Sequence, residues 1–284
     1  MQTINSIDQL RRTLEGQNSV ALVPTMGNLH AGHLDLVKLA KQQATCVVVS
    51  IFVNPLQFGA NEDLANYPRT LAVDCEKLKA VGADIVFVPS VAEMYPDCDG
   101  QALKQSITVQ LPPIANDLCG ASRPGHFAGV ATVVLKLFNI VQPQLAVFGK
   151  KDYQQLLIIR EMVKQFNLAI AILAADTVRE PTGLAMSSRN GYLSRAEKAQ
   201  ASQLHAELQQ LGEQIKRQGR RANFLSLEQA AILKLEQQGW RVDYVAIRAA
   251  SNLQAASADE TDVVILAAGK LGTTRLIDNL SLKI

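Results

Sequence analysis

The stretch Val23–Leu36, "VPTMGNLHAGHLDL", carries the end of a predicted strand, a glycine-containing turn and the start of a predicted helix. The apolar run Val20–Val23 leads into it, and Gly27 can take the backbone angles that a tight turn requires. His30 and His33 are two of only four histidines, and their spacing of three places them on one face of the first helical turn. The first amides of a helix lack intrahelical acceptors, and the helix dipole favours negative charge there. The arrangement is therefore typical of a phosphate site.

The segments around this stretch alternate between short apolar runs and longer amphipathic ones, which predicts alternating strands and helices. The strands are expected at 20–24, 46–53, 84–89, 144–149 and 168–174, and the helices at 33–43, 70–81, 127–141 and 153–166. The strands are nearly continuous in apolar and β-branched residues, as in a parallel sheet covered on both faces. The predicted fold class is therefore α/β, with a doubly wound, parallel, Rossmann-like sheet that binds ligands at the carboxyl ends of its strands. Within helix 70–81, one buried face is expected to contain Leu71, Cys75, Leu78 and Val81.

The pattern changes after residue 177. Residues 178–190 are rich in turn formers, and two long polar helices are expected at 195–218 and 224–238, followed by strands at 242–248 and 262–268. We therefore predict a Rossmann-like domain over 1–177 and a smaller C-terminal α+β domain over 178–284. The segment 178–190 is expected to act as a hinge that closes the smaller domain over the ligand as a lid.

Composition favours a packed globular protein. The 284 residues are 48% hydrophobic and 19% charged, and a formal charge of +2 argues against a broad nucleic-acid surface. The four cysteines form no CxxC pair, so neither a zinc knuckle nor a thioredoxin-like motif is indicated. The N-terminal "MQTINSIDQL" lacks the pattern of a secretory signal, and no apolar run approaches the ~20 residues that span a bilayer. We expect a cytoplasmic protein with free thiols and no membrane or nucleic-acid partner.

The histidine pair admits other interpretations. In an arbitrary HxxH sequence both rings would cap the helix and contact solvent, and paired histidines can also ligate zinc. A zinc site would need a third ligand such as His126, which would have to arrive from a distant segment. No G-x-x-x-x-G-K-[ST] occurs, and no G-x-G-x-x-G follows the first of the strands expected above, so neither a P-loop nor a nicotinamide-binding site is indicated.

Several motifs occur in order along nearly the whole chain. They are "VPTMGNLHAGH" (23–33), "VSIFVNPLQF" (49–58), "YPRT" (67–70), "GASRPGHFAGVATVVLKLFN" (120–139), "FGKKDYQQL" (148–156), "MSSRNGYLS" (186–194) and "TRLIDN" (274–279). The "HAGH" element resembles the HxGH signature of the nucleotidyltransferase superfamily, which includes class I aminoacyl-tRNA synthetases. Together the motifs resemble the pantothenate synthetase (pantoate–β-alanine ligase) family.

The resemblance implies an ATP- and Mg²⁺-dependent ligase that joins pantoate to β-alanine in coenzyme A precursor biosynthesis. The pantoate carboxylate attacks the α-phosphorus of ATP, giving pantoyl adenylate and pyrophosphate. The β-alanine amine then displaces AMP. The resemblance also implies a homodimer, with the nucleotide and pantoate bound by residues 1–177.

The resemblance also implies roles for individual residues. The catalytic set is His33, His30, Lys151, Ser187, Ser188 and Arg189. The ATP-binding set is Met26, Gly27, Asn28, Leu29, His30, Ala31, Gly32, His33, Gly149, Lys150, Lys151, Asp152, Val178, Met186, Ser187, Ser188 and Arg189. Pantoate is assigned to Gln57, Gln155, Val133 and Val134, and β-alanine to Gln57. No protein ligand for Mg²⁺ and no base for the amine is implied.

The chemistry of these side chains fits the implied roles. Lys151 can reach phosphates as a point charge, and the neutral amides of Gln57 and Gln155 can hold a carboxylate with little loss of nucleophilicity. Lys150 stands where the family usually has Glu, which adds a positive charge beside the site.

The roles of other polar residues stay open. Asn54 either contacts ligand or caps the turn before Pro55. Arg123 and His126 either line the β-alanine entrance or stabilise a loop, and His205 is expected on the surface.

Three rival functions remain open at this level. Another nucleotidyltransferase would transfer AMP to a phosphate instead of a carboxylate, and a non-catalytic nucleotide sensor would bind ATP without releasing AMP. A tRNA-linked ligase would need a basic domain, which a formal charge of +2 does not indicate.

Overall fold

The computed structural model describes residues 1–59, 62, 64–97, 105–257 and 259–284, so Cys98 lies outside the described residues. The chain divides into two compact units. The first unit contains Met1–Lys150 and Ile158–Asp176, and the second contains Lys151–Leu157 and Thr177–Ile284. The domain roles and the lid motion expected from the sequence stay predictions.

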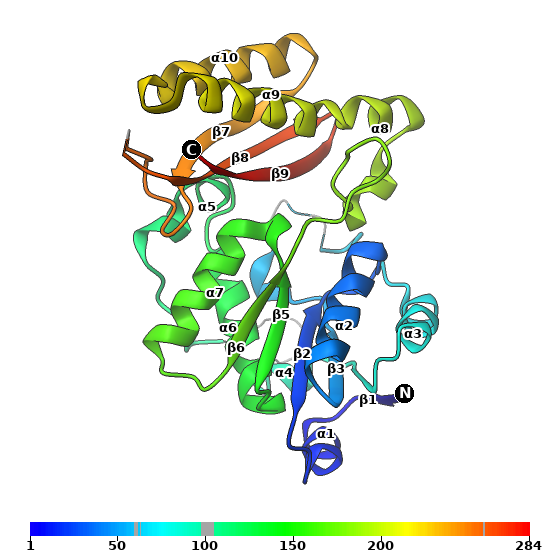
Figure 1. Ribbon diagram of the computed structural model, residues 1–284. Coiled ribbons are helices and arrows are strands. Elements are labelled where there is room, and N and C mark those ends of the chain that lie inside the picture. The colour runs from blue at the N-terminus through cyan, green and yellow to red at the C-terminus, as the bar shows by residue number, and fades with distance from the viewer. Residues whose placement is uncertain (60–61, 63, 98–104, 258) are drawn as a thin grey trace. The chain divides into compact units, whose positions relative to one another are not determined.

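A six-stranded, all-parallel sheet forms the centre of the first unit, in the order β1-β4-β3-β2-β5-β6. Its strands are β1 (Gln2–Ile4), β2 (Val20–Thr25), β3 (Cys46–Ile51), β4 (Ile85–Phe87), β5 (Leu145–Gly149) and β6 (Ala171–Ala175). The chain runs outward from β2 through β3 to β4, and later from β5 to β6 on the opposite side (Figure 1). This order confirms the predicted doubly wound sheet.

Helices cover both faces of this sheet. Consecutive side chains of a strand point to opposite faces, and consecutive residues of β2 and β3 are buried, so both faces need a cover. Ala21, Val23 and Val49 pack in one cluster with Val37 of α2 (Ala31–Gln43). The other helices of this part of the chain are α1 (Ile7–Leu14), α3 (Leu71–Ala80), α4 (Val91–Met94), α5 (Cys119–Ser122), α6 (His126–Val141) and α7 (Tyr153–Gln165), with 3₁₀ helices at Pro55–Gln57, Pro113–Asn116 and Lys150–Asp152. No helix of the described residues is long and apolar enough to cross a membrane.

The two central strands separate toward their carboxyl ends. β2 pairs with β3 along its whole length, from Val20 to Thr25. It pairs with β5 only at Ala21 and Leu22, although both strands continue toward their carboxyl ends. The direction of chain winding reverses between these strands, and ligands of doubly wound sheets bind at that point. The turn after β2 lies at this position.

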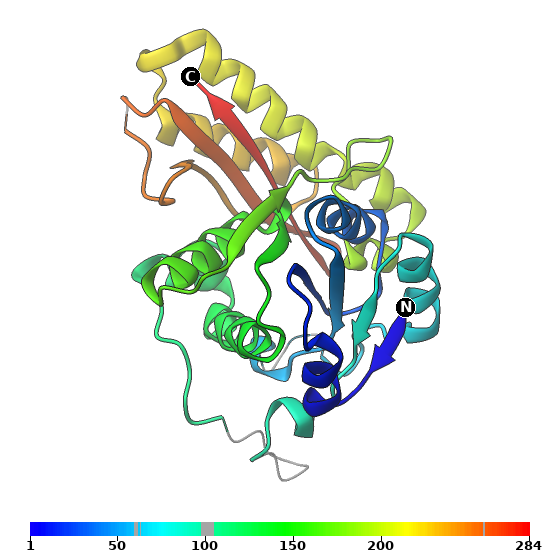
Figure 2. The same cartoon turned by 60° about the horizontal axis from the view of Figure 1, so that its bottom comes forward.

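The edges of the sheet differ from the sequence prediction. β1, the dark blue arrow beside the N-terminus in Figure 2, is an edge strand that the sequence analysis missed. β6 begins at Ala171, although a strand was expected from residue 168. Asn167 adopts a left-handed conformation (φ 52°), and the Leu168 amide donates to the carbonyl of Val163 at 2.9 Å. These residues terminate α7, so they are not available to the strand.

The second unit contains an antiparallel sheet of β7 (Arg241–Ala249), β8 (Asp262–Leu271) and β9 (Thr274–Lys283), in that order. Its helices are α8 (Arg195–Ala201), α9 (Gln203–Gln218) and α10 (Phe224–Gln237), with 3₁₀ helices at Ser188–Tyr192 and Gly219–Arg221. Leu208 and Ile215 of α9 pack in one core with Val263 and Ile265 of β8. The predicted smaller α+β part is therefore confirmed as a fold, although the sequence analysis gave no strand for β9.

The helix expected at 195–218 is interrupted at one residue. Ser202 separates α8 from α9, although its backbone angles (φ −63°, ψ −21°) are helical. Its hydroxyl donates to the carbonyl of Ala199 at 2.8 Å, a local bond that competes with regular helical hydrogen bonding.

Helix α6 packs unusually closely against the segment that follows β3. A Cβ atom on Gly129 would lie 2.2 Å from the carbonyl oxygen of Leu56 and 2.8 Å from the amide nitrogen of Gln57. Both are backbone atoms and cannot rotate away. Glycine at this position therefore permits the contact between α6 and the 3₁₀ helix Pro55–Gln57.

We predict that Gly129→Ala lowers the free energy of unfolding by about 1–3 kcal/mol, because the added methyl group overlaps fixed backbone atoms. Urea unfolding measures the change. Gly191→Ala is the control, because a Cβ atom there meets nothing within 4 Å. An unfolding midpoint of Gly129→Ala equal to that of the control would contradict this account of the packing.

Candidate functional site

The turn after β2 has a conformation that only certain residues tolerate. Gly27 has φ 83° and Asn28 has φ 49°, both in the left-handed region. A Cβ atom on Gly27 would also lie 3.1 Å from Cγ2 of Ile51 and 3.3 Å from Oδ2 of Asp74. The backbone of this turn therefore lies close to β3 and to α3, and both the positive φ and the limited space favour glycine at this position.

The carboxylate of Asp74 holds this turn in place. It accepts the amide of Asn28 on Oδ2 and the amide of Leu29 on Oδ1, each at 2.8 Å. The hydroxyl of Thr70 donates to Oδ2 at 3.0 Å, and Lys77 donates to the carbonyl of Leu29 at 2.6 Å. Asp74 is fully buried. Helix α3 therefore binds two amides of the turn through Asp74 and one carbonyl of the turn through Lys77. We call these contacts the Asp74 clamp.

This clamp was not predicted from the sequence. The predicted inner face of α3 is confirmed at three of its four positions, which are buried or packed against the core, and is wrong at the fourth. Leu71, which was expected to be buried, is 40% exposed, and Asp74 occupies the buried face together with Leu78. The signal was present, because Asp74 stands four residues before Leu78 and four after Thr70. An acidic residue on a buried helical face requires hydrogen-bond donors, and a nearby glycine-containing turn supplies them.

His30 and His33 face one another at the start of α2. Their ring centroids are 4.0 Å apart, and the amide of His30 donates to Nδ1 of His33 at 3.3 Å. A backbone amide can only donate, so Nδ1 of His33 is the acceptor. In the neutral ring the proton therefore resides on Nε2. His33 is thus preset to donate from Nε2. The amides of Ala31 and Gly32 come before His33, whose amide is the first of this helix to find an acceptor, the carbonyl of His30 at 2.9 Å.

The zinc interpretation of these histidines finds no support in the described residues. Among them, no group of three or more histidine, cysteine, aspartate or glutamate side chains is placed to hold a metal ion. His126, the distant ligand considered above, contacts the backbone of Gln57 instead.

The side chain of Gln57 lies beside the turn, and Asn54 fixes its amide. Asn54 donates from Nδ2 to Oε1 of Gln57 at 3.2 Å and to the carbonyl of Gly129 at 3.1 Å. The Gln57 amide nitrogen in turn contacts the sulfur of Met26 at 2.8 Å. Asn54 is 1% exposed and also caps the 3₁₀ helix by accepting the amide of Leu56, so the capping role is supported. Gln57 thus connects the segment after β3 to the turn after β2.

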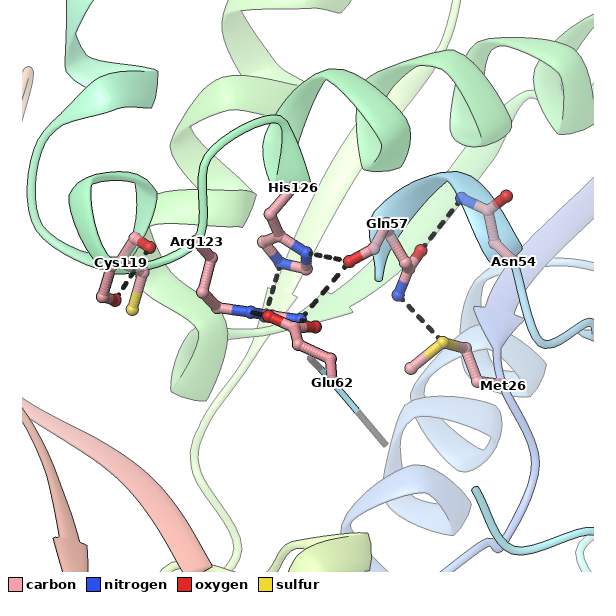
Figure 3. Close-up of polar contacts among 8 residues, drawn as sticks. Met26, Asn54, Gln57, Glu62, Cys119, Arg123 and His126 are labelled. Carbon is pink, nitrogen blue, oxygen red and sulfur yellow. Dashed lines mark hydrogen bonds and ion pairs between the residues drawn. The ribbon is translucent and has the colours of Figure 1, made fainter. Parts of the chain in front are cut away.

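The backbone of Gln57 is held from the opposite side (Figure 3). Nδ1 of His126 lies 2.8 Å from the carbonyl of Gln57, and Arg123 donates to the same oxygen at 3.4 Å. Arg123 also forms two 2.6 Å hydrogen bonds with the carboxylate of Glu62 and contacts Nε2 of His126 at 2.8 Å. Since a carbonyl only accepts, the proton of neutral His126 resides on Nδ1. These contacts favour the structural role for Arg123 and His126.

The predicted site residues are distributed over both units. The first unit contains Met26 to His33, Gln57, Val133, Val134, Gly149 and Lys150, and the second contains Lys151, Asp152, Gln155, Val178 and Met186 to Arg189. Within the first unit, Gln57 and Met26 are brought into contact. Val133 and Val134 are 6% and 4% exposed, and Val133 stands one turn beyond Gly129 on the same side of α6. Lys150 forms an exposed ion pair with Asp176 at 2.6 Å.

Lys151 has an unfavourable environment for its charge. Burial lowers the pKa of Lys151, and the carboxylates of Asp152 and Asp278 offset only part of this effect. The nearby guanidinium groups of Arg189 and Arg179 lower the pKa further. A lysine that stays in such surroundings is a candidate functional group, because its charge is poorly compensated by the protein itself.

The predicted segment 178–190 folds back on itself. The amide of Met186 donates to the carbonyl of Val178 at 2.9 Å, and Arg179 forms an antiparallel bridge with Ala185. The hydroxyl of Ser187 accepts the amide of Arg189 at 3.2 Å, which starts the following 3₁₀ helix. The segment is therefore a short hairpin, and it presents Ser187 to Arg189 directly after its second arm.

A buried carboxylate anchors this hairpin to β9. Arg179 donates to both oxygens of Asp278, at 2.6 and 3.0 Å. Nδ1 of His205 lies 3.5 Å from Oδ2 of Asp278, so the prediction of a surface position for His205 was wrong. Burial alone would raise the pKa of Asp278, but hydrogen bonds from His205 and Arg179 outweigh it and lower the pKa. Asn279 also donates to the carbonyl of Lys151 at 2.8 Å, which fixes the backbone of that lysine.

Comparison with known proteins identifies the family. The family model of Pantoate-beta-alanine ligase matches residues 1–281. The chain belongs to the pantoate-beta-alanine ligase family. Family membership makes it a ligase and confirms the resemblance inferred from the motifs.

Individual members of the family are similar over their full length. The pantothenate synthetase of Methylobacillus flagellatus is 59% identical over 284 residues, 100% of this chain and 99% of the relative. The crystal structure of pantothenate synthetase from Thermus thermophilus superposes with a TM-score of 0.90 at 43% identity, covering 99% of each chain. The pantoate-beta-alanine ligase of Francisella tularensis, complexed with beta-gamma ATP and beta-alanine, has a TM-score of 0.78 at 35% identity, covering 99% of this chain and 97% of that one.

We predict that Asp74→Asn lowers the free energy of unfolding by about 1–3 kcal/mol, because one turn amide then faces an NH₂ donor instead of an acceptor. Urea unfolding of purified protein measures this loss. Asp35→Asn is the control, since the contact described for Asp35 is an exposed ion pair with Lys38 on α2. Equal midpoints for the two variants would show that the clamp contributes nothing to stability.

We also predict that Lys151→Met raises the urea midpoint at pH 7. The lowered pKa of Lys151 means that the folded chain binds this proton less tightly than the unfolded chain does. The free energy of unfolding therefore increases as pH rises from the folded-state pKa of Lys151 to the ordinary pKa of lysine. Below the folded-state pKa, Lys151 is charged in the folded chain, and this buried charge destabilises the fold.

Lys150→Met serves as the matched control, because Lys150 is a solvent-exposed neighbour whose ion pair contributes about 0–1 kcal/mol. Its midpoint is expected to stay near that of the wild type. A lower midpoint for Lys151→Met than for Lys150→Met would contradict the account of Lys151.

Proposed function

We propose that this chain joins pantoate to β-alanine with ATP, through a pantoyl-adenylate intermediate, and releases AMP and pyrophosphate. The observation that carries the proposal is the clamped turn after β2, which ends in a helix N-terminus at the reversal point of the sheet. The complex of the Francisella tularensis relative with beta-gamma ATP and beta-alanine supports the same substrates for this chain.

In the first step, a carboxylate oxygen of pantoate bonds to the α-phosphorus, and the bond from that phosphorus to the bridging oxygen breaks. The electron pair leaves with pyrophosphate. The negative charge that shifts onto the leaving group needs preorganised donors. We assign the amides of Ala31 and Gly32 and the Nε2 proton of His33 to this task, with His30 as a second imidazole. Residues Met26 to Leu29 hold these donors in position.

Pantoate is assigned to neutral groups. The Gln57 amide lies beside Met26 of the turn, so a carboxylate bound there would be near the phosphates. An amide donor fixes a carboxylate without neutralising its charge, and the carboxylate therefore stays nucleophilic. Gln155 is assigned to the same substrate, and Val133 and Val134 to its methyl groups. Gln57 is also assigned to β-alanine.

In the second step, the β-alanine nitrogen bonds to the acyl carbon, the acyl–oxygen bond breaks, and AMP leaves. The proton lost by the amine passes to solvent or to phosphate. Lys151, Ser187, Ser188 and Arg189 are assigned to the phosphates, since hydroxyl and guanidinium groups suit phosphate oxygens. Gly149, Lys150, Asp152, Val178 and Met186 are assigned to the nucleotide.

Mg²⁺ is expected to accompany ATP. Mg²⁺ keeps several water ligands and binds substrate phosphates, so it needs few protein carboxylates, and the absence of a three-ligand cluster among the described residues is compatible with it. When bound, it would neutralise phosphate charge. The homodimer implied by the resemblance and the cytoplasmic location expected from the sequence stay predictions.

The deciding experiment is the exchange of labelled pyrophosphate into ATP in the absence of β-alanine. We expect exchange only when pantoate is added, because adenylate formation reverses without the amine. Exchange that requires a phosphorylated acceptor would favour another nucleotidyltransferase. ATP binding without exchange, and without AMP release when both substrates are present, would favour a nucleotide sensor.

The same assay tests the assigned donors. His33→Ala is expected to slow exchange by about 10²-fold or more, the effect of removing one preorganised donor. Lys38→Ala is the control, because Lys38 is exposed on the same helix and pairs only with Asp35 among the contacts described for it. An exchange rate for His33→Ala equal to that of the control would refute the assigned role.

A further inference from the structure

The orientation of the Asn54 side chain follows from two backbone groups, one of which can only donate and one of which can only accept a hydrogen bond. The amide of Leu56 only donates, and it contacts Oδ1 of Asn54 at 3.3 Å. The carbonyl of Gly129 only accepts, and it lies 3.1 Å from Nδ2 of the same side chain. The oxygen and nitrogen of Asn54 are therefore distinguished by their partners, and a flipped amide would lose both contacts.

The orientation of Gln57 follows in turn. Nδ2 of Asn54 is a donor, so the Gln57 atom that it contacts at 3.2 Å is the acceptor Oε1. The Nε2 donor of Gln57 must then point the opposite way, and it lies 2.8 Å from the sulfur of Met26. Figure 3 shows this sequence of contacts from Asn54 through Gln57 to Met26. Gln57 is consequently fixed as a hydrogen-bond donor toward the turn after β2.

Tyr95 adds the remaining contact to Asn54. Its hydroxyl lies 2.7 Å from Oδ1 of Asn54, and the residue is 1% exposed. Because Oδ1 is an acceptor, the tyrosine hydroxyl donates. Burial raises the pKa of Tyr95, so this hydroxyl stays protonated across the neutral range. The ring packs near Phe52, with centroids 6.1 Å apart, and Nζ of Lys136 lies 5.0 Å from its centroid.

We propose that Tyr95 is a positioning residue that acts through Asn54 to hold the Gln57 amide as a donor toward the acid substrate. The proposal rests on the proposed function and extends it. The Nε2 group selects a substrate that presents an acceptor, such as a carboxylate or a hydroxyl oxygen. A substrate that presents only a donor at this position would form no hydrogen bond with Nε2, because two donors would face one another. Neither the resemblance nor the sequence pattern pointed to Tyr95.

The test is a double-mutant cycle on steady-state kinetics. Tyr95→Phe removes one hydrogen bond, and we expect KM for pantoate to rise about five- to tenfold while KM for ATP stays near that of the wild type. Gln57→Ala should raise KM for pantoate at least as much. If Tyr95 acts through Gln57, the double variant behaves like Gln57→Ala alone. Tyr244→Phe, in the sheet of the second unit, should change neither constant.

The outcomes separate the proposals. Independent, multiplicative effects of Tyr95→Phe and Gln57→Ala, or equal losses for pantoate and ATP, would overturn the positioning role. A wild-type enzyme without pantoate-dependent exchange would overturn the proposed function instead. Should Tyr95→Phe fail to fold, Gln57→Glu keeps the shape of the side chain but replaces Nε2 with oxygen. It should lose pantoate use, and an unchanged KM for pantoate would overturn the inference.

Discussion

The contact between the Asp74 carboxylate and the amides of Asn28 and Leu29 is the constraint on which the rest of the site depends. The turn carries two successive residues with positive φ, and its amides point into the protein, where unpaired donors would be costly. A carboxylate from α3 satisfies them, although it is 46 and 45 residues away in sequence. Helix α2, which has His30 as its N-cap and His33 in its first turn, takes its starting position from this contact.

Paired donors and acceptors also fix the segment after β3. Asn54, Gly129 and the backbone of Leu56 form a set of contacts in which each donor meets an acceptor, and Gln57 is oriented as a result. His126 and Arg123 hold the carbonyl of Gln57. The candidate site of the first unit is therefore built from groups whose orientation is set by contacts within the fold. Such preorganisation reduces the cost of aligning a nucleophile with its target.

The sequence predicted the centre of the fold better than its edges. β2, β3 and β5 were found because buried parallel strands are continuous apolar runs, whereas the three-residue edge strand β1 offers too short a pattern. β6 begins late because Asn167 and Leu168 complete the end of α7, a role that apolar periodicity does not reveal. The break at Ser202 arises from a hydroxyl contact within a sequence that otherwise favours one helix.

The sequence predicted a candidate site at this turn, but it did not predict the residues that support the turn. Gly27, His30 and His33 stand within one short motif, and local geometry sufficed to suggest their role. Asp74 and Tyr95 act on residues 46 and 41 positions away, so only the folded chain connects them to the site. His205 was placed on the surface for the same reason, because its partner Asp278 lies on a distant strand.

The central claim is that a triphosphate binds at the turn held by Asp74. A crystal structure of the enzyme with a non-hydrolysable ATP analogue tests it most directly. The account predicts phosphate oxygens within hydrogen-bond distance of the Ala31 or Gly32 amide and of Nε2 of His33, with the contacts from Asp74 to Asn28 and Leu29 retained. Phosphates bound away from this turn, or a turn that releases Asp74 to bind them, would contradict the account.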